Sequence, residues 1–316
     1  MPCFHSSIRK LSAGVLRPFR ALSTFDRVKA VRAVGGRELT EGELRAHKDR
    51  LLAIYDDFAE VCTSCGATFS LGGGSALGAI RHGGFIPWDD DLDVNLPRDD
   101  WPKVRAELIR RFGSRYRLAE PGREHPHNLA FPRLWSLDGA PGERLFLDIF
   151  LFENVPDGRM LRAVHGVVSL ALGFLYSCRK MHAEGRLLAA RGAHGSVFWF
   201  KRTLGACLSF ASLLSWTGLW YGWNALFSAH GGSRFVTCPV GRRHYFGELC
   251  RRSDMFGVRK GEFEGRLVPV PPDVEAYMTR LYGSDYMIPP PPERRERHVV
   301  YETSVDGRLN REGVRI

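Results

Sequence analysis

Two aspartates separated by one apolar residue, Asp91 and Asp93, carry the clearest chemical signal in this 316-residue sequence. Side chains alternate between the two faces of a strand, so Leu92 and Val94 would point into a core while both carboxylates share the other face. Carboxylates placed side by side repel each other, and a dication such as Mg²⁺ or Mn²⁺ removes that repulsion. Asp89 has the same parity and could extend the group. A run of acids alone is typical of a solvated loop, but the alternation favours a metal site.

A glycine turn precedes the acids along the chain. The sequence predicts a strand over residues 68–71 that runs into Gly73 and Gly74, followed by a short helix from Ser75 to Arg81. Glycine lets a phosphate approach the free backbone N–H groups at a helix start, and the Ser75 hydroxyl could donate a further hydrogen bond. Phosphoryl transfer requires phosphate donors beside metal ligands. The two motifs together therefore predict a phosphoryl-transfer site.

Helices and strands alternate around these motifs, which predicts an α/β (α+β) fold. An amphipathic helix over residues 40–64 begins at Thr40, a good N-cap, with Glu43 in the capping-box position. Cys62 and Cys65 form a single CxxC at its end, interpreted as small buried residues rather than metal ligands. Later strands are expected at 91–96, 116–119, 129–134 and 145–152.

Charge and cysteine content narrow the class of protein. The formal net charge of +10 is compatible with a generally basic surface, or with nucleic acid, an anionic membrane or a phosphorylated substrate as partner. Nucleic-acid binding needs basic residues interleaved with exposed aromatics, whereas the aromatics here cluster in a charge-poor stretch, so no nucleic-acid partner is expected. Seven cysteines argue against a full disulfide framework and favour a reducing compartment.

The central section, residues 160–235, differs in composition from the rest. Residues 163–178 and 203–229 are apolar and poor in charge, and basic residues lie between them. The second stretch holds aromatics of the kind that cluster at membrane interfaces: Trp216, Trp220, Tyr221 and Trp223. We expect helices that lie on or dip into a membrane surface. Packing on the rest of the chain and a true membrane span are the alternatives.

The stretch GGGSALGAIRHGGFIPWDDDLDV, residues 72–94, resembles the signature of the LicD/fukutin family, a branch of the nucleotidyltransferase-fold superfamily. LFLDIFLFENVP (145–156) resembles its LDIF-type strand, and VPVPPDVEAYMTRLYGSDYMIPPPPERRERH (268–298) resembles its C-terminal run. The resemblance covers roughly residues 46–156 and 236–298. It implies the nucleotidyltransferase fold, a mixed sheet flanked by helices, to which the central section would be a mostly helical apolar insertion.

The resemblance also implies a transfer reaction. Members of the family move a phospho-alcohol, such as phosphocholine or a phospho-polyol, from a CDP-linked donor to a sugar hydroxyl, and CMP leaves. The acceptor is a surface glycan such as lipopolysaccharide or teichoic acid, and it can be lipid-linked. A cytoplasmic location at the inner face of a membrane is expected, because CDP-linked donors are made there and no secretory signal is visible.

Residue by residue, Asp91 and Asp93 match the metal-binding pair of the family. Asp148, one acid inside an apolar run, matches the third carboxylate, which could hold a second metal or take the proton of the acceptor hydroxyl. The alternative for Asp148 is a buried acid paired with an arginine such as Arg133. The donor-phosphate turn of the family is matched by Gly73, Gly74 and Ser75.

Other residues have two interpretations each. Arg81 and His82 could reach the donor phosphates, or they are surface residues at a helix end. The basic cluster 294–298 ends at His298, where the family pattern ends; it could grip phosphate or form a solvated basic face. Trp88 is either a stacking wall for a base or choline group, or a core residue.

These motifs divide the chain into a basic N-terminal arm (1–39), the first part of a catalytic core (40–159), the central section (160–235), the second part of the core (236–300) and a tail (301–316). Two other functions remain open. A nucleotidyltransferase would attach NMP to an acceptor and release pyrophosphate. A basic nucleic-acid- or membrane-binding protein would have no catalysis. An inactive family member that acts as a membrane-bound partner is a further alternative, and the intact set of Asp91, Asp93 and Asp148 argues against it.

Overall fold

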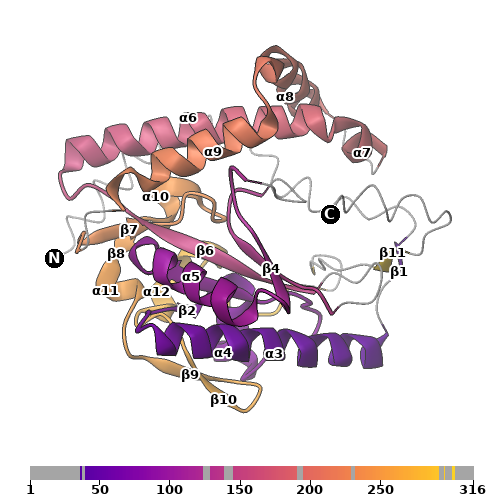
Figure 1. The fold of residues 1–316 in the computed structure, drawn as a ribbon, viewed down its shortest axis with the longest axis vertical. Helices are drawn as coiled ribbons and strands as arrows, with labels where there is room; N and C mark the ends of the chain where they lie inside the picture. The colour runs from indigo at the N-terminus through magenta and orange to yellow at the C-terminus, as the bar shows by residue number, and fades with distance from the viewer. Residues whose placement is uncertain are drawn as a thin grey trace.

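The computed structural model of the chain describes residues 36–37, 40–123, 129–138, 145–190, 195–228, 232–291, 295 and 301–302. Within these residues the chain forms a mixed sheet with helices on both sides (Figure 1). Helices α6 (Arg159–Ala183) and α9 (Leu213–Asn224) lie on one side of strand β6 (Phe146–Asn154), and α3 (Glu41–Ser64) and α4 (Gly73–His82) lie on the other. The expected mixed sheet flanked by helices is therefore confirmed.

The main sheet of the described chain has the strand order β2-β3-β6-β5-β4, with β7 beside β6 and β8 beside β7. Its other strands are β2 (Ser70–Leu71), β3 (Asp93–Pro97), β4 (Tyr116–Ala119), β5 (Arg133–Ser136), β7 (Phe235–Thr237) and β8 (Cys250–Arg251). Strands β3 and β6 run parallel, and the other pairs are antiparallel. A parallel pair needs a long crossover, which here includes α5 (Trp101–Phe112).

Shorter elements complete the described structure. The helices are α7 (Gly185–Ala190), α8 (Ser196–Cys207), α10 (His244–Glu248), α11 (Arg252–Met255), α12 (Val274–Tyr282) and the 3-10 turns η1 (Arg98–Asp100), η2 (Leu208–Phe210) and η3 (Ala225–Phe227). Strands β9 (Lys260–Phe263) and β10 (Arg266–Pro269) form a hairpin, and β1 (Gly36–Arg37) pairs with β11 (Tyr301–Glu302).

Helix α3 begins where the sequence predicts. The Thr40 side chain accepts a hydrogen bond from the Glu43 backbone N–H, and the Glu43 carboxylate accepts one from the Thr40 backbone N–H. This reciprocal capping box satisfies two of the N–H groups that a helix start leaves open. Cys62 is fully buried near the other end, and burial raises the pKa of its thiol. The interpretation as a buried residue is confirmed for Cys62, whereas Cys65 is only half-buried.

Strand β3 begins at Asp93, two residues after the predicted start, because its pairing with β6 begins there, opposite Asp148. Helix α4 begins earlier than predicted, at Gly73, since the N–H of Ala76 already donates to the carbonyl of Gly72. The alternation itself holds. Leu92 and Val94 are fully buried in the core.

The central section is helical, as expected. By length and composition alone, α6 could cross a membrane, and so could the segments Ser196–Phe210 and Leu213–Phe227 taken together, although they are bent by 92°. Core helices of soluble proteins meet the same criteria, so the contacts of the section decide how it is used. Leu170 of α6 packs with Val155 and Tyr245, and Tyr176 packs with Trp220 of α9. One side of the section therefore rests on the rest of the chain.

The aromatic cluster of α9 faces inward, contrary to the expectation that it would meet a membrane interface. Trp220 is 7% exposed, and the indoles of Trp216 and Trp223 donate hydrogen bonds to backbone carbonyls. Tyr221 contacts the guanidinium of the buried Arg98, which is also paired with Glu153 of β6. These hydrogen bonds of the indole N–H groups and of the Tyr221 hydroxyl orient the rings toward the protein interior. The exposed aromatics lie elsewhere, at Trp199, Phe200 and Phe210.

Candidate active site

Two carboxylates pack closely against the first turn of α4. A Cβ atom built on Gly73 would lie 2.8 Å from Oδ2 of Asp93, and one built on Gly74 would lie 2.8 Å from Oδ2 of Asp89. Gly73 also has a φ of +42°, which disfavours any side chain. The glycines are therefore required by the approach of two aspartates, whereas the sequence suggested the approach of a phosphate.

The backbone around this turn is braced from three directions. The N–H of Asp93 donates to Ser75 Oγ over 2.9 Å, and the N–H of Gly73 donates to the hydroxyl of Tyr277 over 3.2 Å. Asn95, next on the same face of β3, donates to the same hydroxyl over 3.3 Å and to the Leu71 carbonyl over 3.1 Å. Ser75 and Gly73 thus hold the Asp93 strand against the helix start.

Asp148 stands beside Asp93. The two residues are register partners on the parallel strands β3 and β6, so their side chains leave the same face of the sheet. The strand pairing thus places Asp148 next to Asp93, while its role as the third carboxylate stays a prediction. Asp148 is 5% exposed, and Asp91 and Asp93 are half-buried.

The alternative interpretation of Asp148 also describes part of its environment. Arg133 on β5 donates from Nε to Oδ1 over 2.5 Å and from Nη2 to Oδ2 over 2.7 Å. The same guanidinium lies 3.6 Å from the ring centroid of Phe146 and 5.2 Å from that of Trp135. Arg133 therefore fixes the Asp148 carboxylate in one orientation while leaving further lone pairs on both oxygens.

We expect Arg133→Met to destabilise the fold by about 3–5 kcal/mol, because it removes the guanidinium from a buried carboxylate. The free energy of unfolding in urea measures the effect. Arg110→Met is the matched control, since Arg110 is 67% exposed and its pair with Glu107 lies at the surface, where such pairs contribute below about 1 kcal/mol. Equal losses in the two variants would show that the Asp148 pair does not stabilise the fold.

Tyr282, which the sequence analysis did not assign to the site, lies among its carboxylates. Burial raises the pKa of its phenol, and the negative charges of Asp93, Asp89 and Asp91 raise it further, while the guanidinium of Arg242 opposes them. That guanidinium lies 5.5 Å from the centroid of the Tyr282 ring. A phenol in this setting stays protonated and can donate a hydrogen bond. Its signal in the sequence is its place in the C-terminal run 268–298, which resembles that of the family.

Arg81 borders the same cluster. Its Nη1 donates to the Tyr286 carbonyl over 2.8 Å and its Nε to His82 over 2.9 Å. Burial lowers the pKa of Arg81, while Tyr282 and the Asp89 carboxylate raise it, which places the guanidinium near both. His82 is exposed, and burial against its neighbours, then Arg81, lower its pKa. His298 lies outside the described residues.

Trp88 combines its two predicted roles. It packs partly buried against the core, and the guanidinium carbons of Arg295 and Arg81 lie 4.2 Å and 6.0 Å from its ring. The ring therefore joins the C-terminal basic cluster to the helix that carries the glycine turn.

The site's donors are oxygen atoms of carboxylates, the ligands that suit Mg²⁺ or Mn²⁺. Asp93 and Asp89 approach the same helix turn, and Asp91 joins them around Tyr282. Within the part of the chain that the structure describes, no three acidic, histidine or cysteine side chains are already arranged as a set of metal ligands. The oxygen chemistry thus fits a hard dication, with the Asp148 carboxylate oriented by Arg133.

Glu248, at the end of α10, gives the region a pH dependence. It is 2% exposed, and burial raises its pKa to about 7. The folded protein therefore holds a proton that the unfolded chain has already lost, so stability falls as pH rises from about 4.5 through 7. The loss is roughly 1.4 kcal/mol for each unit of pKa difference. We expect Glu248→Gln to flatten this fall. The melting temperature of the variant minus that of the wild type should therefore increase from pH 5 to pH 8. A constant difference would contradict it.

Fold and site together define a mixed α/β protein that gathers aspartates from two adjacent parallel strands against a glycine-rich helix start. The family model described as LicD/FKTN/FKRP, nucleotidyltransferase domain, matches residues 66–168, which include α4, β3 and Asp148. The lipopolysaccharide cholinephosphotransferase LicD of Haemophilus influenzae is 27% identical over 281 residues, which cover 83% of this chain and 98% of that protein. An uncharacterized protein of Rickettsia typhi is 36% identical over 116 residues, 36% of this chain and 33% of its own length. Residues 66–168 therefore form a LicD-family domain, and the likeness to LicD extends over most of the chain.

Proposed function

We propose that this chain is a phosphotransferase that moves phosphocholine, or a related phospho-alcohol, from a CDP-linked donor to a sugar hydroxyl of a surface glycan such as lipopolysaccharide. The observation that carries the proposal is the aspartate cluster at the glycine turn, within a likeness to a lipopolysaccharide cholinephosphotransferase that runs along nearly all of that protein. The nucleotidyltransferase fold suits the same chemistry. A cytoplasmic site of action would give access to the donor.

In the proposed reaction, the acceptor hydroxyl oxygen bonds to the phosphorus that carries the alcohol. The bond from that phosphorus to the bridging oxygen breaks, CMP leaves with the oxygen, and the hydroxyl proton passes to a carboxylate or to water. Asp91 and Asp93 would hold Mg²⁺ or Mn²⁺, with Asp148 and Asp89 as further ligands. A bound dication supplies charge neutralisation at the diphosphate.

Other side chains of the site have matching roles in this proposal. Arg81 and Arg242 bring positive charge beside the carboxylates, where a diphosphate would need it. The protonated phenol of Tyr282 can donate to a phosphate oxygen. Trp88 offers a ring face for a base or for a trimethylammonium group.

The test is to incubate the full chain with Mg²⁺ or Mn²⁺, a lipopolysaccharide acceptor and a panel of CDP-choline, CDP-glycerol and CDP-ribitol, and to measure CMP. CMP released with one donor, together with labelled glycan, supports the proposal and identifies the alcohol. Pyrophosphate released from CTP, with NMP attached to the acceptor, would replace it by nucleotidyl transfer. If neither CMP nor pyrophosphate is released under any of these conditions, a catalytic role is overturned.

A further inference from the structure

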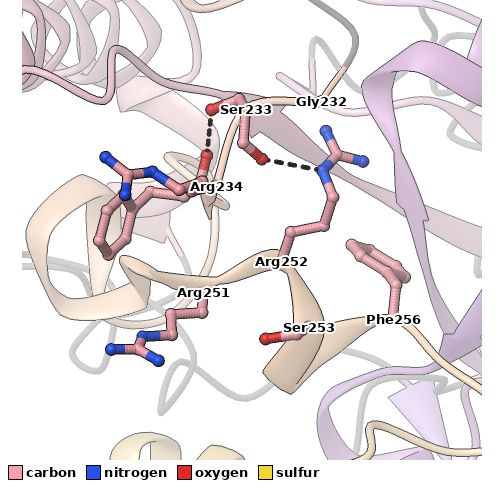
Figure 2. A pocket seen from close by; sticks show the side chains of 8 residues that line it. Gly232, Ser233, Arg234, Arg251, Arg252, Ser253 and Phe256 are labelled. Atoms are coloured by element: carbon pink, nitrogen blue, oxygen red, sulfur yellow. Dashed lines mark hydrogen bonds between the residues drawn. The ribbon is translucent and has the colours of Figure 1, made fainter.

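A pocket of about 550 Å³ lies beside strands β7 and β8 (Figure 2). It is lined by Gly232, Ser233, Arg234, Phe235, Arg251, Arg252, Ser253 and Phe256. Arg252 contacts Asn154 at the end of β6, and Asp148 lies six residues earlier on that strand. At about 3.3 Å per residue, the pocket is therefore roughly 20 Å from the candidate active site.

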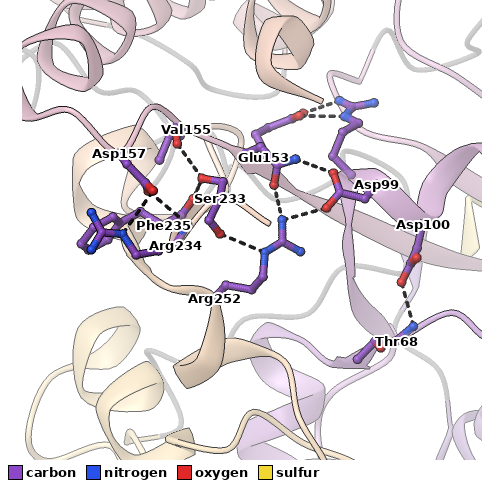
Figure 3. A network of polar contacts seen from close by, with 12 residues as sticks. Thr68, Asp99, Asp100, Glu153, Val155, Asp157, Ser233, Arg234, Phe235 and Arg252 are labelled. Carbon is purple, nitrogen blue, oxygen red and sulfur yellow. Dashed lines mark hydrogen bonds and ion pairs between the residues drawn. The ribbon is translucent and has the colours of Figure 1, made fainter. Parts of the chain in front are cut away.

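Three arginines line this pocket, and two of them are held in place. The Nη2 of Arg252 donates to Asp99 over 2.8 Å and its Nε to the Ser233 carbonyl over 3.1 Å (Figure 3). The Nε of Arg234 donates to Asp157 over 3.1 Å. Arg251 is exposed to solvent. Three guanidiniums beside two carboxylates leave a net positive charge, which suits an anion with several oxygen acceptors.

The arginine pocket lies directly beside the start of α6. Asp157, the partner of Arg234, is two residues ahead of the helix, and the Arg162 guanidinium lies 4.3 Å from the ring centroid of the pocket residue Phe235. From this point α6 turns an apolar stripe to solvent. Its members lie one helical turn apart: Met160 is 84% exposed, Val164 53% and Val167 45%.

Exposed apolar side chains continue over the helices that pack against α6, and with the stripe they form what we term the outer face. They are Trp199 and Phe200 of α8, Phe210 of η2, Leu219 of α9 and Leu226 of η3. The sequence of residues 159–228 contains a single acid, Glu184, against many basic residues. Exposed apolar side chains in a section rich in basic residues are characteristic of a surface that meets an anionic membrane.

We propose that the outer face docks on an anionic phospholipid surface, with the arginine pocket receiving a lipid phosphate and the stripe of α6 entering the interface. The charge of the pocket and its position at the end of the stripe carry this inference. Each basic residue near such a surface contributes about 1 kcal/mol, and the apolar side chains add their transfer into the interface. The inference does not depend on the reaction proposed above.

The test is co-sedimentation of the full chain with vesicles of phosphatidylcholine alone and of phosphatidylcholine with phosphatidylglycerol. Binding should require phosphatidylglycerol and weaken as salt rises. Arg251→Glu should weaken it at least fivefold, and Met160→Asp with Val164→Asp at least tenfold. The matched controls are Lys260→Glu and Val258→Asp, which change an exposed cation and a 98% exposed valine on another part of the surface.

Circular dichroism and melting temperature report whether each variant is folded, and CMP release with a soluble acceptor should be the same in all of them. Equal binding to neutral vesicles would overturn the requirement for an anionic surface. A loss of binding in the controls as large as in the variants would overturn the assignment of binding to the outer face. Binding of inorganic phosphate in the pocket without any vesicle binding would identify a site for free anions and overturn the membrane proposal.

Discussion

Asp93→Asn is expected to lower the rate of transfer by on the order of 10³-fold, the loss typical when a charged group that stabilises the transition state is removed. Melting temperature should change little, because Leu92 and Val94 supply the buried face of β3 and the backbone N–H of residue 93 can still donate to Ser75. Turnover is measured as CMP release. Binding of Mn²⁺ to the purified protein, followed by its paramagnetic signal, gives a second readout and should weaken in parallel.

Asp49→Asn is the matched control, since it makes the same chemical change at an exposed position of α3. It should leave CMP release and Mn²⁺ binding unchanged. Asp93→Asn retaining near-normal turnover in the presence of EDTA would rule out metal-dependent catalysis through this residue. A variant that has lost activity together with its folded circular dichroism spectrum would instead indicate a structural role.

Gly73→Ala should reduce turnover by about 10²-fold or more, because its new methyl group would lie 2.8 Å from Oδ2 of Asp93 and must displace that carboxylate. The left-handed φ of +42° adds a stability cost of about 1 kcal/mol. The two effects can be separated at the other end of α4. Gly83 has a φ of +66° and nothing within 4 Å of its Cβ position, so Gly83→Ala carries the strain without the clash.

Both glycine variants are therefore expected to lose similar stability, and Gly73→Ala alone should lose activity. The comparison uses CMP release at saturating donor together with melting temperature. Similar activity in the two variants would mean that the approach of Asp93 to the helix start has no part in catalysis. A defect confined to KM would point to donor binding at the turn, the role that the sequence suggested for it.

Local patterns in the sequence predict much of this site. Alternation places Asp91 and Asp93 opposite Leu92 and Val94 because a strand has a period of two residues, and a period of two needs no knowledge of neighbouring strands. The capping box of Thr40 and Glu43 is equally local. The register of Asp93 with Asp148 depends on how two distant strands pair, so only the resemblance to a family suggested it.

Other residues of the site belong to segments far away in the sequence, and local sequence patterns cannot predict that such segments meet. Tyr277 and Tyr282 lie on α12, more than two hundred residues after the glycine turn, and they reach it through the folding of the whole chain. Composition also predicted that the central section is helical, but not which side of each helix is buried. The indole and phenol groups of α9 found backbone carbonyls and Arg98 as partners, which reversed the expected orientation of its aromatics.

The pairing of β6 with β7 places Asn154 directly opposite Val236, so the chain leaves the sheet and returns to it at neighbouring points, with the outer face in between. Each doubling in length of such a connection costs only about 0.6 kcal/mol in closure entropy. Evolution could therefore enlarge, trim or exchange everything between these two residues while the strand that carries Asp148 keeps its register. Relatives that modify different acceptors can thus diverge here first, and a chimaera joined at Asn154 and Val236 would transfer the outer face without touching the aspartates.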